Sequence, residues 1–237
     1  MEITTRRKIL ILLLLFISTV CANSAAKTDN PSLQSLRQDF LAAEQALGRD
    51  DAAFQALKAR LDAQDYPLLP YLKLKEHLNN LSALKSDQVE LFLATYSDTP
   101  LANRLHSAWL KHLAKKKRWW TYRAFYKPTR STSQQCTYLW ALFNTGKAQE
   151  AMKKAVKVWL SGSSQPKACD PMFEVLQDND LLTEKLVWAR IDLAMEQRSS
   201  RLARYLGRFL PKPEQSWLNQ WLDIHRHPAT RKGCRLQ

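Results

Sequence analysis

The stretch YLWALFNTGKAQEA, residues 138–151, carries the clearest fold signal in this sequence of 237 residues. Leu139 and Leu142 are spaced like residues on the buried side of a helix, and Gly146 then breaks the helical pattern. Small residues follow from Ala148 onward, and alanines allow a second helix to approach the first closely. The stretch therefore predicts a helix–turn–helix hairpin that partly matches the tetratricopeptide pattern.

Apolar residues recur at helical spacing on both sides of this hairpin, and single prolines and glycines separate the periodic segments. Helices are predicted at 33–47, 53–61, 70–78, 87–94, 101–113, 119–126, 133–144, 148–160, 171–176, 181–195, 202–210 and 217–225. Ser86 is the predicted N-cap of the fourth of them. No segment of useful length alternates as a half-buried strand does, so the fold class is predicted to be all-α.

Short connections between the predicted helices favour antiparallel neighbours. A repeat of about 34 residues does not persist along the whole chain, so a regular tetratricopeptide array is not expected. We predict an irregular α-superhelix, or solenoid, built from antiparallel helix pairs. A compact helical bundle is the alternative.

The composition excludes several classes of protein. Hydrophobic residues make up 45% and charged residues 24% of the chain, so it holds enough apolar surface to fold. Only 5 glycines and 4 cysteines exclude a collagen-like repeat and a disulfide-dense mini-scaffold. The 36 Lys and Arg exceed the 22 Asp and Glu, giving a net charge of +14 that favours polyanionic partners.

Residues 1–22 are typical of an export signal. Three basic residues at 6–8 precede an apolar run at 9–20, and candidate cleavage positions follow at 22–26. The run is shorter than the roughly 20 residues that span a bilayer, although an uncleaved anchor would still hold the chain at a membrane. Cys21 suggests a lipoprotein, but the residues before it fit that signal poorly. We therefore expect an exported protein without nucleic acid as a partner.

A basic run directly precedes a group of aromatic residues. Its members are Lys111, Lys115, Lys116, Lys117 and Arg118, followed by Trp119 and Trp120. Cations beside aromatic rings form a candidate contact surface for a glycan or a polyanion. The alternative is an ordinary solvated helix face with aromatic residues in the core.

Cys136 and Cys169 flank one predicted helix pair in a chain that we expect to be exported. A bond between them would tie the start of the hairpin to the loop that follows it, and would stabilise the fold by about 3–4 kcal/mol. Two buried free thiols are the alternative. Cys21 would leave with the leader, and Cys234 has no evident partner.

Signatures of catalysis and of metal binding are scarce. Neighbouring carboxylates such as Asp178 and Asp180 lie at predicted turns and helix starts, where aspartate commonly caps a helix. His225, His227 and Cys234 are too few and too close to the end of the chain to indicate a metal site. We expect no metal, no cofactor and no catalytic residue in this sequence.

Several phrases resemble one family, in order and at compatible spacing from about residue 33 to residue 227. They are DYPLLPYL (65–72), QCTY (135–138), NTG (144–146), WLSGSSQPKACD (159–170) and RIDLAM (190–195). Together these phrases resemble the N-terminal part of the soluble lytic murein transglycosylases. The SQPKACD phrase with its upstream cysteine is the most specific of them.

The resemblance implies a U-shaped superhelical domain over 27–228 and a periplasmic location. Residues 229–237 have no helical apolar stripe and are expected to form an irregular tail. It implies peptidoglycan strands as the substrate class, cleaved between MurNAc and GlcNAc to give a 1,6-anhydro product, and a disulfide between Cys136 and Cys169. In the family, a lysozyme-like domain carries the catalytic Glu in a Glu-Ser pair. None of the nine glutamates here precedes a serine, so no catalytic residue is carried over.

We therefore expect a truncated chain without the lysozyme-like catalytic domain, ending in a tail typical of a frameshift or a premature stop. Its predicted function is that of the N-terminal scaffold of a peptidoglycan lytic transglycosylase, inactive by itself. The alternative is a periplasmic helical-repeat module that binds peptidoglycan or an envelope protein.

Overall fold

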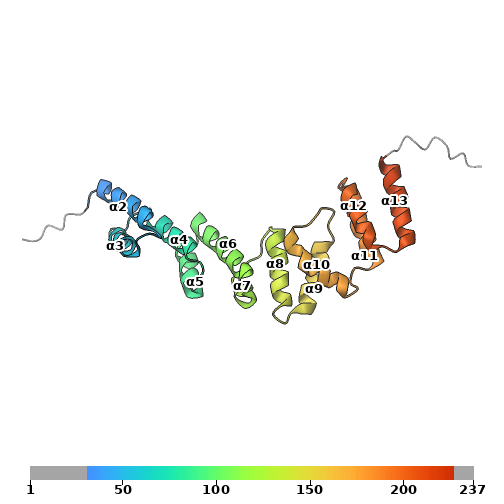
Figure 1. Ribbon diagram of the computed structural model, residues 1–237, viewed down its shortest axis with the longest axis horizontal. Coiled ribbons are helices and arrows are strands. Elements are labelled where there is room, and N and C mark those ends of the chain that lie inside the picture. The colour runs from blue at the N-terminus through green and yellow to red at the C-terminus, as the bar shows by residue number, and fades with distance from the viewer. Residues whose placement is uncertain (1–30, 227–237) are drawn as a thin grey trace, which may run out of the picture. The chain divides into compact units, whose positions relative to one another are not determined.

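The computed structural model of the protein describes residues 31–226 (Figure 1). Those residues form twelve α-helices and two short 3₁₀ helices, with no β-strand among them, so the predicted all-α fold is confirmed. The α-helices are α2 (Leu33–Ala46), α3 (Asp51–Asp62), α4 (Leu69–Asn79), α5 (Ser86–Thr95), α6 (Pro100–Lys115), α7 (Trp119–Phe125), α8 (Thr132–Phe143), α9 (Ala148–Trp159), α10 (Asp170–Asp178), α11 (Glu184–Glu196), α12 (Ser200–Leu206) and α13 (Lys212–Arg226). The 3₁₀ helices are η1 (Lys167–Cys169) and η2 (Gly207–Phe209). The predicted leader at 1–22, the tail at 229–237, Cys21 and Cys234 lie outside the described residues.

Side-chain caps fix the start of several helices. The side chains of Ser32, Asp50, Ser131 and Thr183 each accept a hydrogen bond from a backbone N–H in the first turn that follows. Ser86 was wrongly predicted as a cap, because it is already the first residue of α5. The cap position belongs to Lys85, whose backbone N–H donates to the side-chain oxygen of Gln88 over 3.0 Å.

The segment 202–210, predicted as one helix, is divided in the structure. Helix α12 ends at Leu206, and η2 carries the chain on to Phe209. Close packing accompanies this change, because a Cβ on Gly207 would lie 2.8 Å from a methyl carbon of Leu218 in α13. Periodicity along the chain does not encode such a contact between neighbouring helices.

The chain divides into two compact units, and residues up to Asn79 form the first. Within it α2 and α3 pack together as a pair, and α4 packs on both. The turn between α2 and α3 contains Gly48 with a φ of +77°, a conformation that glycine adopts without a Cβ penalty. The buried core of this unit consists of Leu36, Ala43, Phe54, Leu61, Tyr66, Leu69 and Leu72.

The second unit begins at Asn80 and contains the predicted hairpin. Helices α8 and α9 pack against each other, and Gly146 in the turn between them has a φ of +80°. Ala151 and Ala155 are fully buried, so α9 approaches its neighbours closely through small side chains. The structure therefore confirms the predicted helix–turn–helix hairpin.

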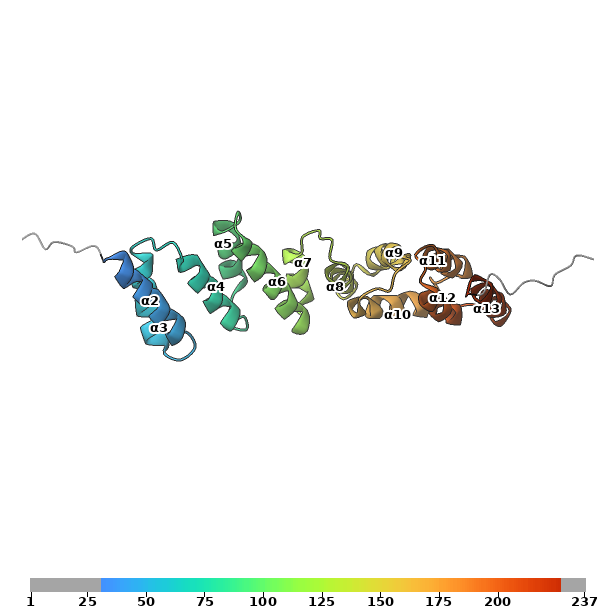
Figure 2. The same cartoon turned by 90° about the horizontal axis from the view of Figure 1, so that it is seen from above.

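The pairing of consecutive helices continues along the second unit. Helix α10 packs on both α8 and α9, α11 packs on α12, and α12 packs on α13 (Figure 2). One hydrophobic cluster runs from Leu139 in α8 to Leu222 in α13 and includes the fully buried Met172, Leu176 and Ile191. These contacts fix the surroundings of the disulfide and of the cavity described below.

Candidate interaction surface

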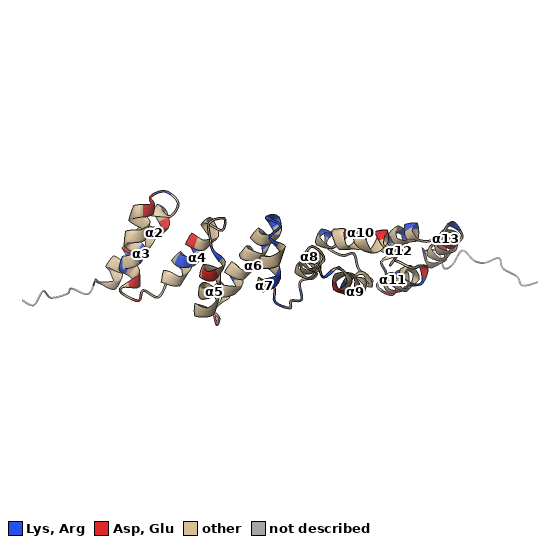
Figure 3. Cartoon of the chain, turned by 90° about the horizontal axis from the view of Figure 1, so that it is seen from below, with Lys and Arg blue, Asp and Glu red and all other residues tan. Residues whose placement is uncertain are grey.

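Helix α6 ends in an exposed group of cations that we call the basic turn. It consists of Lys111, Lys115, Lys116, Lys117 and Arg118, all of them exposed, and it connects α6 to α7. Lys117 adopts a φ of +54°, which turns the chain sharply after the helix. In Figure 3 the Lys and Arg residues, drawn in blue, are seen at the end of α6 beside α7.

The opposite face of α6 explains why these cations point to solvent. Leu105, Trp109 and Leu113 are between 0 and 1% exposed, so the apolar stripe of the helix is buried in the core. Trp109 packs edge-on against Phe125 of α7 with ring centroids 6.0 Å apart, which fixes α7 against α6. The same packing therefore buries the apolar face and presents the basic one.

No acidic side chain forms an ion pair with the basic turn within residues 31–226. The charges of these cations also affect the pKa of His112, which lies among them. Burial first, and then the charges of Lys116, Arg118 and Lys115, lower the pKa of His112 below its usual value. The basic turn therefore carries a local excess of positive charge that the rest of the described chain leaves uncompensated.

The two tryptophans beside the basic turn have different environments. Trp120 is 70% exposed, and the guanidinium of Arg123 lies 5.3 Å from the centre of its ring. Trp119 is half-buried and packs edge-on against the buried Tyr122, 6.4 Å away. Only Trp120 therefore offers an open aromatic face to a ligand, while Trp119 belongs largely to the packing of α7.

A stacked tyrosine pair that the sequence reading did not single out lies nearby in the second unit. The rings of Tyr126 and Tyr138 stack 3.9 Å apart and line a cavity of about 400 Å³ with Lys154. Burial raises the pKa of Tyr126, with a smaller contribution from Tyr138. The sequence gives little indication of this tyrosine pair, because its two members lie on opposite sides of the loop between α7 and α8.

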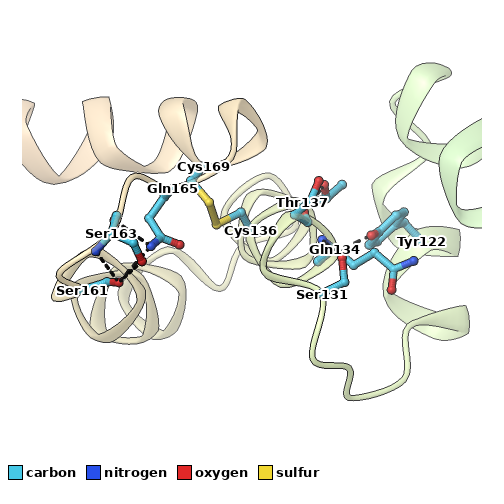
Figure 4. Close-up of a disulfide and its surroundings, with 10 residues drawn as sticks. Tyr122, Ser131, Gln134, Cys136, Thr137, Ser161, Ser163, Gln165 and Cys169 are labelled. Atoms are coloured by element: carbon cyan, nitrogen blue, oxygen red, sulfur yellow. Dashed lines mark hydrogen bonds between the residues drawn. A yellow bond between two sulfur atoms is a disulfide. The ribbon is translucent and has the colours of Figure 1, made fainter. Parts of the chain in front are cut away.

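Cys136 and Cys169 are joined by a disulfide and are both fully buried (Figure 4). The bond ties α8 to η1, immediately before α10, and closes a loop with a sequence separation of 33 residues. Gln165 secures the intervening loop by donating to the hydroxyl oxygen of Ser161 over 2.9 Å and to the carbonyl of Ser163 over 3.0 Å. The SQPKACD phrase at 164–170 therefore lies in a segment held in place by the disulfide and by the hydrogen bonds of Gln165.

Within residues 31–226 no group of three or more His, Cys, Asp or Glu side chains could hold a metal ion. No helix in the same part of the chain is long and apolar enough to cross a membrane. The described residues are all-helical, with packed helix pairs within each unit and one disulfide within the second unit.

Comparison with known proteins shows which protein family the chain is related to. The full chain is 28% identical to the soluble lytic murein transglycosylase of Escherichia coli K12 over 216 residues, which are 90% of its length. The Salmonella typhimurium protein of the same name is 31% identical over 166 residues, or 70% of the chain. The chain is homologous to the soluble lytic murein transglycosylases over most of its length. No protein-family profile matches it.

Solved structures agree with the sequence comparison. The crystal structure of the 70 kDa soluble lytic transglycosylase of Escherichia coli superposes with a TM-score of 0.69 at 30% identity, over 84% of this chain. An inactive mutant of the Pseudomonas aeruginosa lytic transglycosylase Slt superposes equally well at 33% identity, over 81% of the chain. The chain matches the N-terminal helical region of these proteins and spans about a third of the length of its relatives, 33% in the Escherichia coli K12 protein.

Proposed function

We propose that this chain serves as the helical scaffold of a peptidoglycan lytic transglycosylase and binds peptidoglycan without cleaving it. The observation that carries the proposal is the homology over 90% of the chain, combined with the matching helical fold. The absence of any Glu-Ser pair from the printed sequence supports the lack of cleavage, since the family resemblance places the catalytic carboxylate in such a pair. In this proposal the U-type domain covers 27–228.

The proposal places the protein in the periplasm. A leader at 1–22 would export it, and the buried disulfide between Cys136 and Cys169 suits a compartment in which thiols are oxidised. The strongly basic composition suits a wall polymer whose peptides carry carboxylates, and nucleic acid is not expected as a partner.

The basic turn is the proposed contact with peptidoglycan. Its five cations are exposed and unpaired in the described part of the chain, and Trp120 adds an open ring on which a sugar face could stack. Each exposed charge pair contributes about 0–1 kcal/mol, so the contact depends on several cations acting together. Binding should therefore weaken as salt shortens the screening length.

Co-sedimentation with purified murein sacculi tests this proposal. Replacing Lys115, Lys116 and Lys117 together by glutamine should weaken binding about tenfold, because roughly 1.4 kcal/mol is lost. A matched control replaces the exposed lysines 147, 153 and 157, which removes the same charge elsewhere in the second unit. Equal weakening by both triple variants would contradict a specific contact, and binding that grows with salt would contradict an electrostatic one.

The same experiment separates the alternative partner class. If the chain fails to sediment with sacculi at low salt and instead captures an envelope protein through the basic turn, the helical-repeat module for a protein partner replaces the peptidoglycan scaffold. A chain that sediments with DNA and not with sacculi would overturn both.

A further inference from the structure

A cavity of about 480 Å³ lies in the second unit, away from the basic turn. Its walls come from the end of α9, the loop before η1, and helices α10, α11 and α12 with η2. This volume falls within the range of pockets that hold small ligands. The side chains that line it are unusually rich in arginine and aromatic groups.

Arg190 of α11 is the most constrained of these groups. Its side chain lies in the interior with only 5% of the residue exposed, and its guanidinium stacks 4.5 Å from the centre of the Trp159 ring. The Nε–H donates to the carbonyl oxygen of Ser161 over 3.1 Å. No carboxylate forms an ion pair with Arg190 in the described part of the chain.

A guanidinium carries five N–H donors, and the hydrogen bond to Ser161 uses only the one on Nε. The remaining donors belong to Nη1 and Nη2, and Arg190 lines the cavity. Arg190 is only 5% exposed, so its charge is poorly solvated, and this burial lowers its pKa to about 10. A buried cation in this state is stabilised by an anion placed against its free donors.

Two further arginines line the same cavity. Arg201 lies on α12 and Arg208 on η2, and neither forms an ion pair within residues 31–226. The guanidinium of Arg208 lies 4.1 Å from the centre of the Tyr205 ring, which limits the freedom of its side chain. Three arginines from three different elements therefore line one small cavity.

The opposite charge is also present in the wall. Asp170 and Glu174 of α10 line the cavity, although no cation pairs with either of them in the described residues. The carboxylates in the wall would repel a compact, doubly charged anion such as phosphate. They favour a ligand that carries a single carboxylate together with a positive group.

We propose that this cavity binds a short zwitterionic peptide. Arg190, Arg201 and Arg208 hold its carboxylate, and Asp170 and Glu174 hold its ammonium group. The rings of Trp159 and Phe173 cover the apolar part of the ligand. The proposal does not rest on the proposed function, because it concerns a site distinct from the basic turn.

Titration of the ¹⁵N-labelled full chain with the tripeptide alanyl-alanyl-alanine, which carries one carboxylate and one ammonium group, tests the inference by NMR. The expected result is a saturable shift of the Arg190 Nε–H and Trp159 indole signals. Arg201→Gln and Arg208→Gln, which alter exposed side chains, should each raise the dissociation constant about three- to fivefold. Arg190→Lys should raise it about tenfold or more, because lysine cannot offer a planar pair of donors.

Arg204→Gln is the matched control, since Arg204 is exposed on α12 but does not line the cavity. Equal weakening by Arg204→Gln would reduce the effect to general charge and overturn the proposal. Inorganic phosphate binding as tightly as the tripeptide would overturn the zwitterionic ligand. Glu174→Gln should weaken the tripeptide about threefold, and unchanged affinity would contradict the ammonium contact.

This result is independent of murein co-sedimentation. Loss of tripeptide binding with intact sacculus binding contradicts only the cavity, and the reverse pattern contradicts only the basic turn. The two inferences therefore fail separately.

Discussion

Replacing Gly162 by alanine should destabilise the second unit through a clash with the backbone. A Cβ at this position would lie 2.3 Å from the carbonyl oxygen of Leu193 and 2.7 Å from its carbonyl carbon. That oxygen also accepts the hydrogen bond from the N–H of Gln197 that closes the end of α11. Neither atom belongs to a flexible side chain, so the loop or the helix must move.

The cost follows from how far the two segments must separate. Overpacking a well-packed interior typically costs 1–3 kcal/mol, and a clash with backbone belongs near the upper end, at about 2–3 kcal/mol. For a chain of this size such a loss lowers the melting temperature by roughly 5–10 °C. Displacing the loop also moves the carbonyl of Ser161, which accepts the hydrogen bond from Arg190.

Thermal unfolding followed by circular dichroism measures the effect, with hydrogen exchange at the last turn of α11 as a local readout. Ser163→Ala is the control, because Ser163 is exposed in the same loop and should change the free energy of unfolding by less than about 0.5 kcal/mol. If Gly162→Ala unfolds within 1 °C of the wild type, the close approach of this loop to α11 is wrong.

Two further predictions concern the disulfide and pH. Replacing Cys136 and Cys169 together by alanine should lower the free energy of unfolding by about 3–4 kcal/mol, from the loop with a separation of 33 residues, and reductant should then have no further effect on the melting temperature. A variant as stable as the oxidised wild type would contradict this. His112 has a lowered pKa in the folded state, chiefly from burial, so the folded protein binds its proton less readily than the unfolded chain. The wild type should therefore lose stability as the pH falls below about 6.5, the unfolded value, and His112→Gln should lessen that loss in urea titrations at pH 7.5 and 5.5. An unchanged or larger loss in the variant would contradict the assignment.

The helices could be predicted because each carries its own apolar stripe. The stripe of Leu105, Trp109 and Leu113 fixes both the helix and the side that is buried, so the exposure of Lys111 and Lys115 follows from local spacing. The turn at Gly146 was equally local, since a positive φ favours glycine wherever the fold places it.

The features that could not be predicted arise from contacts between distant residues. Arg190 and Ser161 are 29 residues apart in the sequence. Gly162 packs closely against Leu193 of α11, with η1 and α10 between them in the chain. Nothing in the spacing of either residue signals the partner, because helical periodicity describes which face is buried and not what covers it. Trp119 and Trp120 show the same limit, since adjacent identical residues differ in exposure only through the packing of α7.

Mass spectrometry of murein sacculi after incubation with the purified chain tests the central claim most directly. The sedimented fraction should contain bound protein at low ionic strength and release it as salt rises. The soluble fraction should contain no 1,6-anhydro muropeptides above the level of a protein-free incubation. Released 1,6-anhydro products would show that the chain cleaves peptidoglycan and contradict a scaffold role, and absence of the chain from the sacculi at every salt concentration would contradict peptidoglycan binding.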